Sequence, residues 1–247
     1  MKILAIDTSS NNATVAILEN QNIIIELNNN DKKTHSQKLM PMIDDAFKKS
    51  NLSLDDVNLI SCCVGPGSFT GVRIGIATAK AFADSKTIPT VGVTSLNALA
   101  YNLNQDGLIC SLINANNGNV YAGLFEINKG KTLKSKLDFL ALKDLNGNIS
   151  LNSLRDFVEV NNELYSNIYF VGDGAVLYKD LIEKLILKRY LITVIDEQTS
   201  TGMSIGKIGY DKYKNGEYGD SSFLSPIYLR KPQAELALEE KIGIKND

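Results

Sequence analysis

Short apolar runs separated by polar turns open the chain. Residues 3–6, 13–18 and 23–27 are apolar over strand-like lengths, and Asn- and Ser-rich stretches lie between them. Together the three runs predict an antiparallel meander.

A helical period follows the meander. Between residues 37 and 49 the apolar positions recur at helical spacing and the charged ones lie off that stripe. The pattern then predicts a strand over 59–64, a helix over 72–85, a strand over 90–93 and a helix that Ser95 caps, ending at Leu103. The first half therefore has the predicted order β-β-β-α-β-α-β-α.

The second half repeats this order. Strands are predicted over 108–113, 120–127 and 132–139, followed by a weak helix over 151–161 and then by strand 168–171, helix 177–187, strand 191–195 and helix 204–213. Two such units predict a duplicated α/β architecture with a cleft between the halves, typical of the actin-like and sugar-kinase-like (ribonuclease H-like) class. We assign residues 1–104 to a first lobe, 105–232 to a smaller second lobe whose last helix packs back on the first, and 233–247 to a charged tail.

Composition limits the functions to consider. The 26 Lys and Arg are nearly balanced by 28 Asp and Glu, so the net charge of −2 gives no overall field for a polyanion such as tRNA. Three cysteines in apolar runs suggest buried thiols rather than a disulfide framework. The apolar run at the N-terminus is too short for a signal or a membrane span, and we expect a cytoplasmic protein.

A glycine-rich segment joins the strand at 59–64 to the following helix. It comprises Gly65, Pro66, Gly67, Ser68, Phe69, Thr70, Gly71, Val72 and Arg73, and it continues to Gly75. Such a loop can aim backbone N–H groups at a ligand at the helix N-terminus. It matches neither the Walker A pattern nor the dinucleotide fingerprint, and a generic tight turn is an equal alternative.

The helix over 72–85 is apolar nearly all round. Val72, Ile76, Ala79 and Ala83 lie on one face, and Ile74, Ala77, Ala81 and Phe82 lie on the other. We predict a protein–protein interface formed by this helix and the preceding one, through Leu39, Met40, Ile43, Phe47, Val72, Ile76, Ala79, Lys80 and Ala83. Coverage of these residues within the chain itself is the alternative.

Chemistry-bearing residues are few. Asp7, Thr8 and Ser9 follow the first strand, where actin-like ATPases hold phosphate, and are candidates for proximity to a nucleotide. The matching turn of the second half, residues 114–119, has no carboxylate, and residues 172–175 are interpreted as turn chemistry. His35 is the only histidine, so no histidine pair can hold a metal. We predict no catalytic residue and no metal site.

Several motifs resemble the TsaB family in order and spacing. They are residues 3–9, 35–41, 65–75, 91–96 and 226–230. The resemblance implies an actin-like fold and a non-catalytic subunit that binds TsaD and activates it for threonylcarbamoyl transfer to adenosine in tRNA. It also implies TsaE in a larger complex, a functional link to TsaC, a homodimer when the chain is alone, and contact with tRNA only through the complex. No membrane and no cofactor are expected, apart from ATP or ADP at the complex interface.

The sequence departs from the family at one turn. Where Asp-Ala-Arg-Arg and Glu-Val-Tyr are usual, the chain has Asn114-Ala115-Asn116-Asn117 and Asn119-Val120-Tyr121. Three alternatives stay open: a weak ATPase, a glycoprotease-like peptidase that uses Asp7 with Ser9 or Ser68, and a regulator that binds nucleotide without hydrolysing it.

Overall fold

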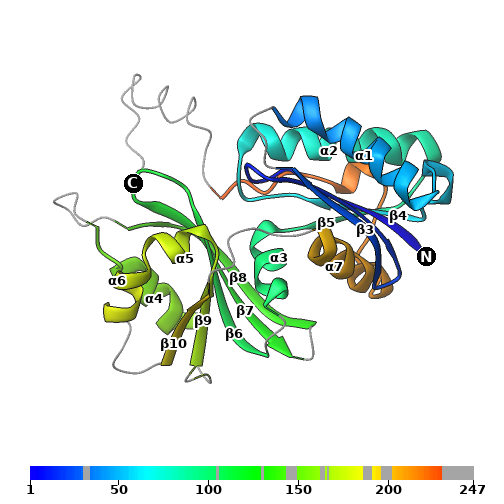
Figure 1. Ribbon diagram of the computed structural model, residues 1–247. Helices are drawn as coiled ribbons and strands as arrows, with labels where there is room; N and C mark the ends of the chain where they lie inside the picture. The colour runs from blue at the N-terminus through cyan, green and yellow to red at the C-terminus, as the bar shows by residue number, and fades with distance from the viewer. Residues whose placement is uncertain are drawn as a thin grey trace.

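The computed structural model describes residues 1–29, 34–103, 106–128, 131–142, 149–161, 165, 167–185, 191–195 and 202–229. The chain forms two lobes that lie side by side, each built on a sheet (Figure 1). The predicted charged tail at 233–247 lies outside the described residues, as does Arg230 of the last motif. No helix among the described residues is long and apolar enough to span a membrane.

The first sheet contains five strands. They are β1 (Lys2–Asp7), β2 (Ala13–Glu19), β3 (Asn22–Asn29), β4 (Leu59–Cys63) and β5 (Thr90–Val93), in the spatial order β3-β2-β1-β4-β5. The first three strands are antiparallel, as the meander predicted, and β4 pairs parallel to β1 and β5 parallel to β4. Helices α1 (His35–Ser50) and α2 (Phe69–Lys86) supply the crossovers.

Alternate residues of these strands enter two different cores. Leu4 and Ile6 face α1 and α2, whereas Ile3 and Ala5 pack on the opposite side against α7 (Gly202–Lys214), the last α-helix among the described residues. Cys62 and Cys63 likewise enter opposite cores, as adjacent strand residues must. Burial raises the pKa of both thiols.

The second sheet repeats the first. It contains β6 (Gly107–Asn114), β7 (Asn119–Asn128), β8 (Lys131–Ala141), β9 (Asn167–Val171) and β10 (Leu191–Ile195), in the order β10-β9-β6-β7-β8. Again three antiparallel strands are followed by two parallel ones, because β9 pairs parallel to β6 and β10 parallel to β9. The predicted duplication is confirmed. Helix α4 (Asn152–Asn161) packs on β8.

Helix α3 (Ser95–Asn102) lies between the two sheets (Figure 1). Its Ala98 belongs to the core behind the first sheet, while Leu96 and Leu99 belong to the core against the second. The prediction placed this helix within the first lobe alone. Its apolar side chains point in two directions, so both lobes share it.

The helix predicted over 177–187 starts earlier and is broken. Helix α5 (Asp173–Leu177) and helix α6 (Lys179–Leu185) meet at Tyr178, and residues 186 and 187 lie outside the described part. Gly172 begins this segment with φ of 104°, and a Cβ there would lie 2.2 Å from the carbonyl oxygen of Leu112. The glycine allows α5 to start directly against β6.

Candidate functional site

The turn after β1 interlocks with the glycine-rich segment. The Asp7 carboxylate accepts the Ser9 N–H at 2.8 Å, and the Thr8 hydroxyl donates to the Gly71 carbonyl at 2.7 Å. The Ser68 N–H in turn donates to the Ser9 carbonyl at 2.7 Å. Asp7, Thr8 and Ser9 are all buried, so the turn and the start of α2 form one packed unit.

Close packing against this turn explains the glycines. A Cβ on Gly67 would lie 2.2 Å from the Ser9 carbonyl oxygen, and one on Gly71 would lie 2.0 Å from that of Thr8. On Gly75 it would lie 2.5 Å from the Thr8 hydroxyl. These distances are far below van der Waals contact. The glycines therefore admit the β1 turn to the N-terminal end of α2, where the sequence interpretation placed a ligand.

The same segment also holds α3. The Ser95 N–H donates to the Gly65 carbonyl at 3.0 Å, and its hydroxyl donates to the Pro66 carbonyl at 2.5 Å. Because α3 contributes to both cores, the glycine-rich segment connects the β1 turn to the helix shared between the lobes. Its role in the fold is to fasten three elements together.

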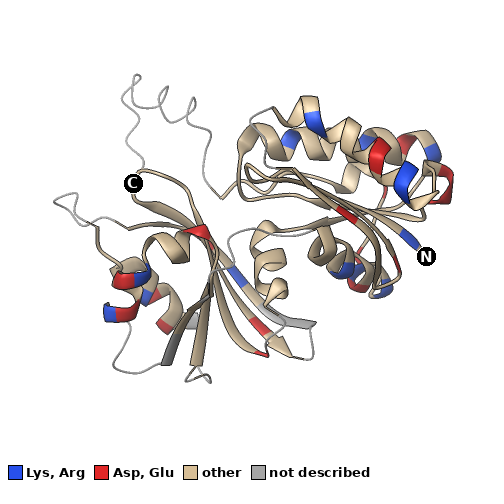
Figure 2. Ribbon diagram, in the orientation of Figure 1, with Lys and Arg blue, Asp and Glu red and all other residues tan. Residues whose placement is uncertain are grey.

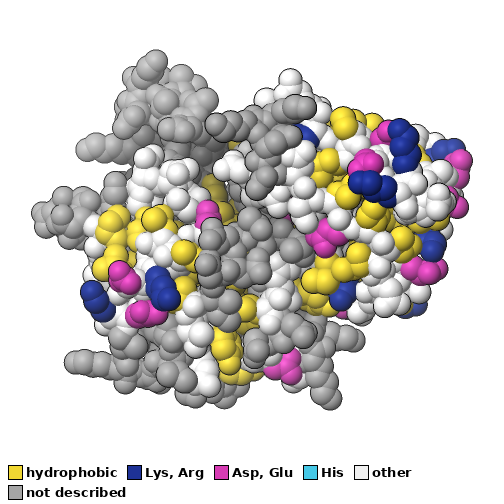
Figure 3. Space-filling view, viewed as in Figure 1, with side chains coloured by type: hydrophobic (Ala, Val, Ile, Leu, Met, Phe, Trp, Pro, Cys, Tyr) yellow, Lys and Arg dark blue, Asp and Glu magenta, His cyan; other side chains and the backbone are white. Residues whose placement is uncertain are grey.

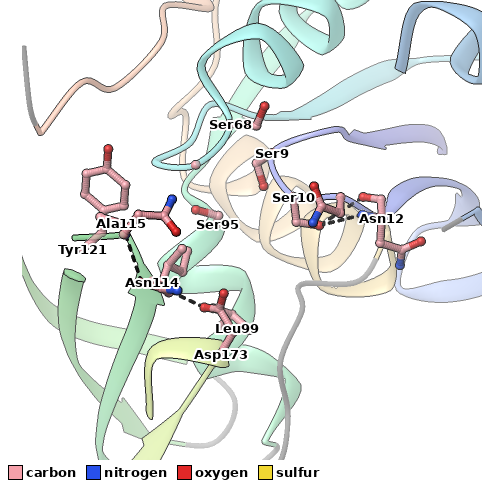
Figure 4. A pocket seen from close by; sticks show the side chains of 14 residues that line it. Ser9, Ser10, Asn12, Ser68, Ser95, Leu99, Asn114, Ala115, Tyr121 and Asp173 are labelled. Carbon is pink, nitrogen blue, oxygen red and sulfur yellow. Dashed lines mark hydrogen bonds between the residues drawn. The ribbon is translucent and has the colours of Figure 1, made fainter. Parts of the chain in front are cut away.

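A cleft of about 680 Å³ lies between the lobes at this point. Figure 4 shows Ser9, Ser10 and Ser68 on the first-lobe side and Asn114, Tyr121 and Asp173 on the second-lobe side. The lining residues are Ser9, Ser10, Asn11, Asn12, Gly67, Ser68, Ser95, Leu99, Ile113, Asn114, Ala115, Asn116, Tyr121 and Asp173. Hydroxyls and amides dominate this lining.

Asp173 brings a carboxylate to the second-lobe turn. Its Oδ1 accepts the Asn114 N–H at 2.9 Å, although the two residues are 59 apart in sequence. The absence of a carboxylate from residues 114–119 suggested that this turn has no acidic group, and the fold corrects that view. The sequence signal is Gly172-Asp173-Gly174 after β9, although this pattern is also typical of a turn. Burial raises the pKa of Asp173, and hydrogen bonds from backbone N–H groups oppose the shift.

The described lining contains no Lys or Arg, and its turns already use backbone amides internally. Besides the Ser9, Ser68 and Asn114 bonds, the amides of Asn12, Gly71 and Asn116 donate to Ser10 Oγ, Ser68 Oγ and Asn114 Oδ1. A phosphate site needs such amides turned toward the anion, usually with a cation. Without a metal ion between them, Asp173 would also repel a phosphate. The described lining thus offers a phosphate no Lys or Arg side chain, and several of the nearby backbone amides are already engaged.

The predicted partner-interface set lies mostly inside the first core. Leu39, Ile43, Val72, Ile76, Ala79 and Ala83 are at most 5% exposed and pack beneath the two helices. Among the nine, Met40 is 50% exposed, and Phe47 and Lys80 are half-buried. The predicted face of α2 is corrected: periodicity could not tell which of its two apolar sides meets the sheet.

The accessible side of α2 is the other apolar side. Ala77 and Ala81 are exposed, and Ile74 and Phe82 are half-buried. Phe69, Thr70 and Arg73 of the glycine-rich segment are exposed on the same helix, whereas Gly65 and Pro66 are buried. We call the surface formed by Met40, Ile74, Ala77, Ala81 and Phe82 the outer face. In Figure 2 the ribbons around it carry charges of both signs, and Figure 3 shows hydrophobic side chains among charged ones on this lobe.

His35 lies at the start of α1, near the glycine-rich segment. Its imidazole carbon Cδ2 would lie 3.2 Å from a Cβ on Gly71. Burial, followed by the charge of Lys38, lowers the pKa of His35. Among the described residues, no three His, Cys, Asp or Glu side chains group as metal ligands do.

Two sheets of identical strand order, with a cleft beside the turn that follows each first strand, define the duplicated actin-like class of α/β proteins. Solved structures agree with this class. YeaZ from Pseudomonas aeruginosa superposes with a TM-score of 0.74 at 22% identity, covering 92% of this chain and 99% of that one. A ROK hexokinase from Thermus thermophilus superposes with a TM-score of 0.55 at 11% identity, covering 87% of this chain and 100% of that one. At these identities the likeness concerns the fold.

The family follows from sequence comparison. The family described as "TsaD: tRNA N6-adenosine threonylcarbamoyltransferase" matches residues 22–238. The TsaB protein of Bacillus subtilis is 32% identical over 236 residues, which cover 95% of this chain and 96% of the relative. The TsaB protein of Haemophilus influenzae is 26% identical, covering 93% and 94%. The chain belongs to the TsaB family of tRNA threonylcarbamoyladenosine biosynthesis proteins, and the resemblance of the motifs is confirmed.

Proposed function

We propose that this chain is a non-catalytic subunit of tRNA threonylcarbamoyladenosine synthesis, which binds TsaD and activates it for threonylcarbamoyl transfer. Support comes from the TsaB relatives and from the match over most of the chain to a family described by the transferase itself. Two chains of shared fold are well suited to pair through equivalent helices. We further propose that TsaE joins the pair, that TsaC acts in the same synthesis, and that the chain dimerises when alone.

The outer face is the observation that carries this proposal. Ala77 and Ala81 are exposed one helical turn apart on α2, and Met40 is half exposed on α1 beside it. Small exposed side chains let another helix come close, and the half-buried Ile74 and Phe82 offer apolar surface at their flank. A partner helix from TsaD would cover this surface.

The cleft supports a non-catalytic role in a second way. The missing cation and the amides already engaged disfavour a phosphate group in the described cleft. We therefore propose that ATP or ADP, where the complex uses it, binds at the boundary with TsaD rather than between the two lobes of this chain.

Light scattering after size-exclusion chromatography tests the proposed contact. The chain is mixed with TsaD of the same organism, as wild type and as Ala77→Arg. An arginine at exposed Ala77 leaves the core intact but blocks close helix approach, so the complex should disappear. Ala79 is unsuitable, because it is completely buried and an arginine there would disrupt the core.

Val160→Arg is the matched control. Val160 is 79% exposed on α4 of the second lobe, so the same charge is added away from the outer face. This variant should bind TsaD as the wild type does. Equal binding by the wild type and Ala77→Arg would reject the outer face, and a reconstituted modification reaction that runs equally well without this chain would reject the function.

A further inference from the structure

An exposed arginine on α2 is held between an aromatic ring of its own helix and one 155 residues later in the chain. The Arg73 guanidinium carbon lies 3.8 Å from the centre of the Phe69 ring, and its Nε donates to the Tyr228 hydroxyl at 2.8 Å. The two rings stack with their centres 5.1 Å apart. We call Phe69, Arg73 and Tyr228 the Arg73 cluster.

A backbone hydrogen bond attaches the segment that carries Tyr228 to the end of β4. Ile227 precedes Tyr228, and its N–H donates to the Val64 carbonyl at 2.8 Å, which fixes the returning segment at the end of β4. Figure 1 shows this segment, in orange, passing close to α2. Phe69 and Arg73 are one turn apart on α2, whereas Tyr228 lies in an irregular segment that the Ile227 bond attaches to the end of β4.

The cluster is exposed, and its positive charge has no acidic ion-pair partner among the described residues. Phe69 is 38% and Tyr228 43% exposed, which is high for large aromatic side chains. Within the described part of the chain no Asp or Glu forms an ion pair with Arg73, and its recorded hydrogen bond uses Nε alone. The planar edge formed by the two terminal nitrogens is the edge that pairs with a carboxylate through two parallel hydrogen bonds.

The cluster continues the outer face. Phe69, Arg73, Ala77 and Ala81 follow one another at intervals of four on α2, and all four are exposed. A helix that packs over Ala77 and Ala81 would therefore reach Arg73 at its end. Tyrosine and arginine are enriched among the residues that dominate binding at protein interfaces.

From this geometry we propose that the Arg73 cluster is the polar anchor of the partner contact, and that its occupant is an Asp or Glu carboxylate of TsaD. The inference rests on the proposed function and deepens it. The apolar side chains of the outer face provide buried contact area, but such contacts do not fix the orientation of the partner helix. The guanidinium, held by Phe69 and Tyr228, fixes the register of the partner helix.

The dissociation constant of the complex with TsaD tests the anchor. Arg73→Gln removes the charge, and Arg73→Lys keeps it but loses the planar fork, so both should weaken binding at least tenfold. Tyr228→Phe removes the hydroxyl that orients the guanidinium and should weaken binding less, by about threefold. Arg155→Gln and Arg155→Lys are matched controls, because the Arg155 side chain is 40% exposed on α4 of the second lobe, away from the outer face. They should bind as the wild type does.

Chemical cross-linking can identify the TsaD carboxylate that contacts residue 73. Arg73→Lys places a primary amine at the anchor, which a zero-length carbodiimide reagent can couple to a neighbouring carboxylate, whereas arginine does not react. Peptide mass spectrometry should then find residue 73 joined to an Asp or Glu of TsaD, and residue 155 of Arg155→Lys not joined to TsaD.

These experiments distinguish failure of the proposed Arg73 anchor from failure of the proposed function. If the wild type binds TsaD, Ala77→Arg does not, and the Arg73 variants bind normally, the anchor is overturned and the proposed function stands. A lowered melting temperature of Arg73→Gln with an unchanged dissociation constant, or weakened self-association without weakened TsaD binding, also overturns it. Absence of any wild-type complex rejects the proposed function and the anchor together.

Discussion

Glu26 on β3 caps the N-terminus of α7, because its Oε1 accepts the Gly202 N–H at 2.8 Å and the Met203 N–H at 3.4 Å. The two elements are 176 residues apart in sequence. A carboxylate at a helix N-terminus satisfies amides that have no intrahelical partner and also interacts favourably with the helix dipole. The bond attaches the last helix to the first sheet.

We predict that removing this cap destabilises the chain. Glu26→Ala should lower the free energy of unfolding in urea by about 1–2 kcal/mol, because the Gly202 and Met203 amides lose their acceptor. Glu26→Gln keeps an acceptor oxygen and should lose about half as much. Glu217→Ala, at an exposed position beyond α7, is the control and should change little. Equal stability of all four proteins would show that the cap contributes nothing.

We predict that a side chain at Gly71 destabilises the chain through a steric clash. Gly71→Ala places a methyl group against the Thr8 carbonyl and should lower the free energy of unfolding by about 3 kcal/mol. Gly216→Ala separates sterics from backbone conformation. Gly216 has no atom within 4 Å of an added Cβ but a φ of +81°, so alanine there should cost only about 1 kcal/mol. A smaller loss at Gly71 than at Gly216, measured by urea denaturation, would contradict the packing argument.

The cleft predicts weak binding of nucleotide by the isolated chain. Calorimetry with ATP in the absence of Mg²⁺ should give a dissociation constant weaker than about 1 mM, because the described lining offers no cation and presents Asp173. Asp173→Asn removes the repulsion and should increase the affinity for ATP more than that for uncharged adenosine. Saturable ATP binding that Asp7→Ala abolishes would instead favour the ATPase or nucleotide-sensing alternatives.

His35 predicts a pH dependence with a defined sign. Burial and the Lys38 charge lower the pKa of His35 below its ordinary value of 6.5. The folded chain therefore binds this proton less readily than the unfolded chain does. The corresponding stability is present above pH 6.5 and is lost as the pH falls through 6.5 toward the lowered value.

Proton NMR can follow this titration directly, because His35 is the only histidine. The midpoint should lie below 6.5 and rise in Lys38→Gln, which removes the neighbouring charge. The stability of His35→Asn, measured at a series of pH values, should lack the corresponding step. A midpoint at or above 6.5 in the wild type would refute the effect of burial.

Much of this architecture could be predicted from local sequence. The alternation of apolar residues along the early strands and the helical stripe containing Leu39 and Ile43 record burial on one or both faces, and the elements formed where this periodicity indicated. The order of strands and helices recurs in the second half, which made the duplication visible. Family membership could be predicted from motifs such as residues 65–75. The glycines of this motif stand at fixed positions because the β1 turn packs against them too closely for a side chain.

Only the tertiary structure determined which apolar side of α2 faces the core and which distant residues meet, because periodicity along one element contains neither. Val72 and Ala79 face the core while Ala77 and Ala81 face outward, a choice between two apolar sides that depends on where the sheet lies. Asp173 reaches Asn114, Glu26 reaches Gly202 and Tyr228 reaches Arg73 only after distant segments come together. Sequence pattern records the burial of each residue along its own element, whereas these contacts depend on how separate elements pack in space.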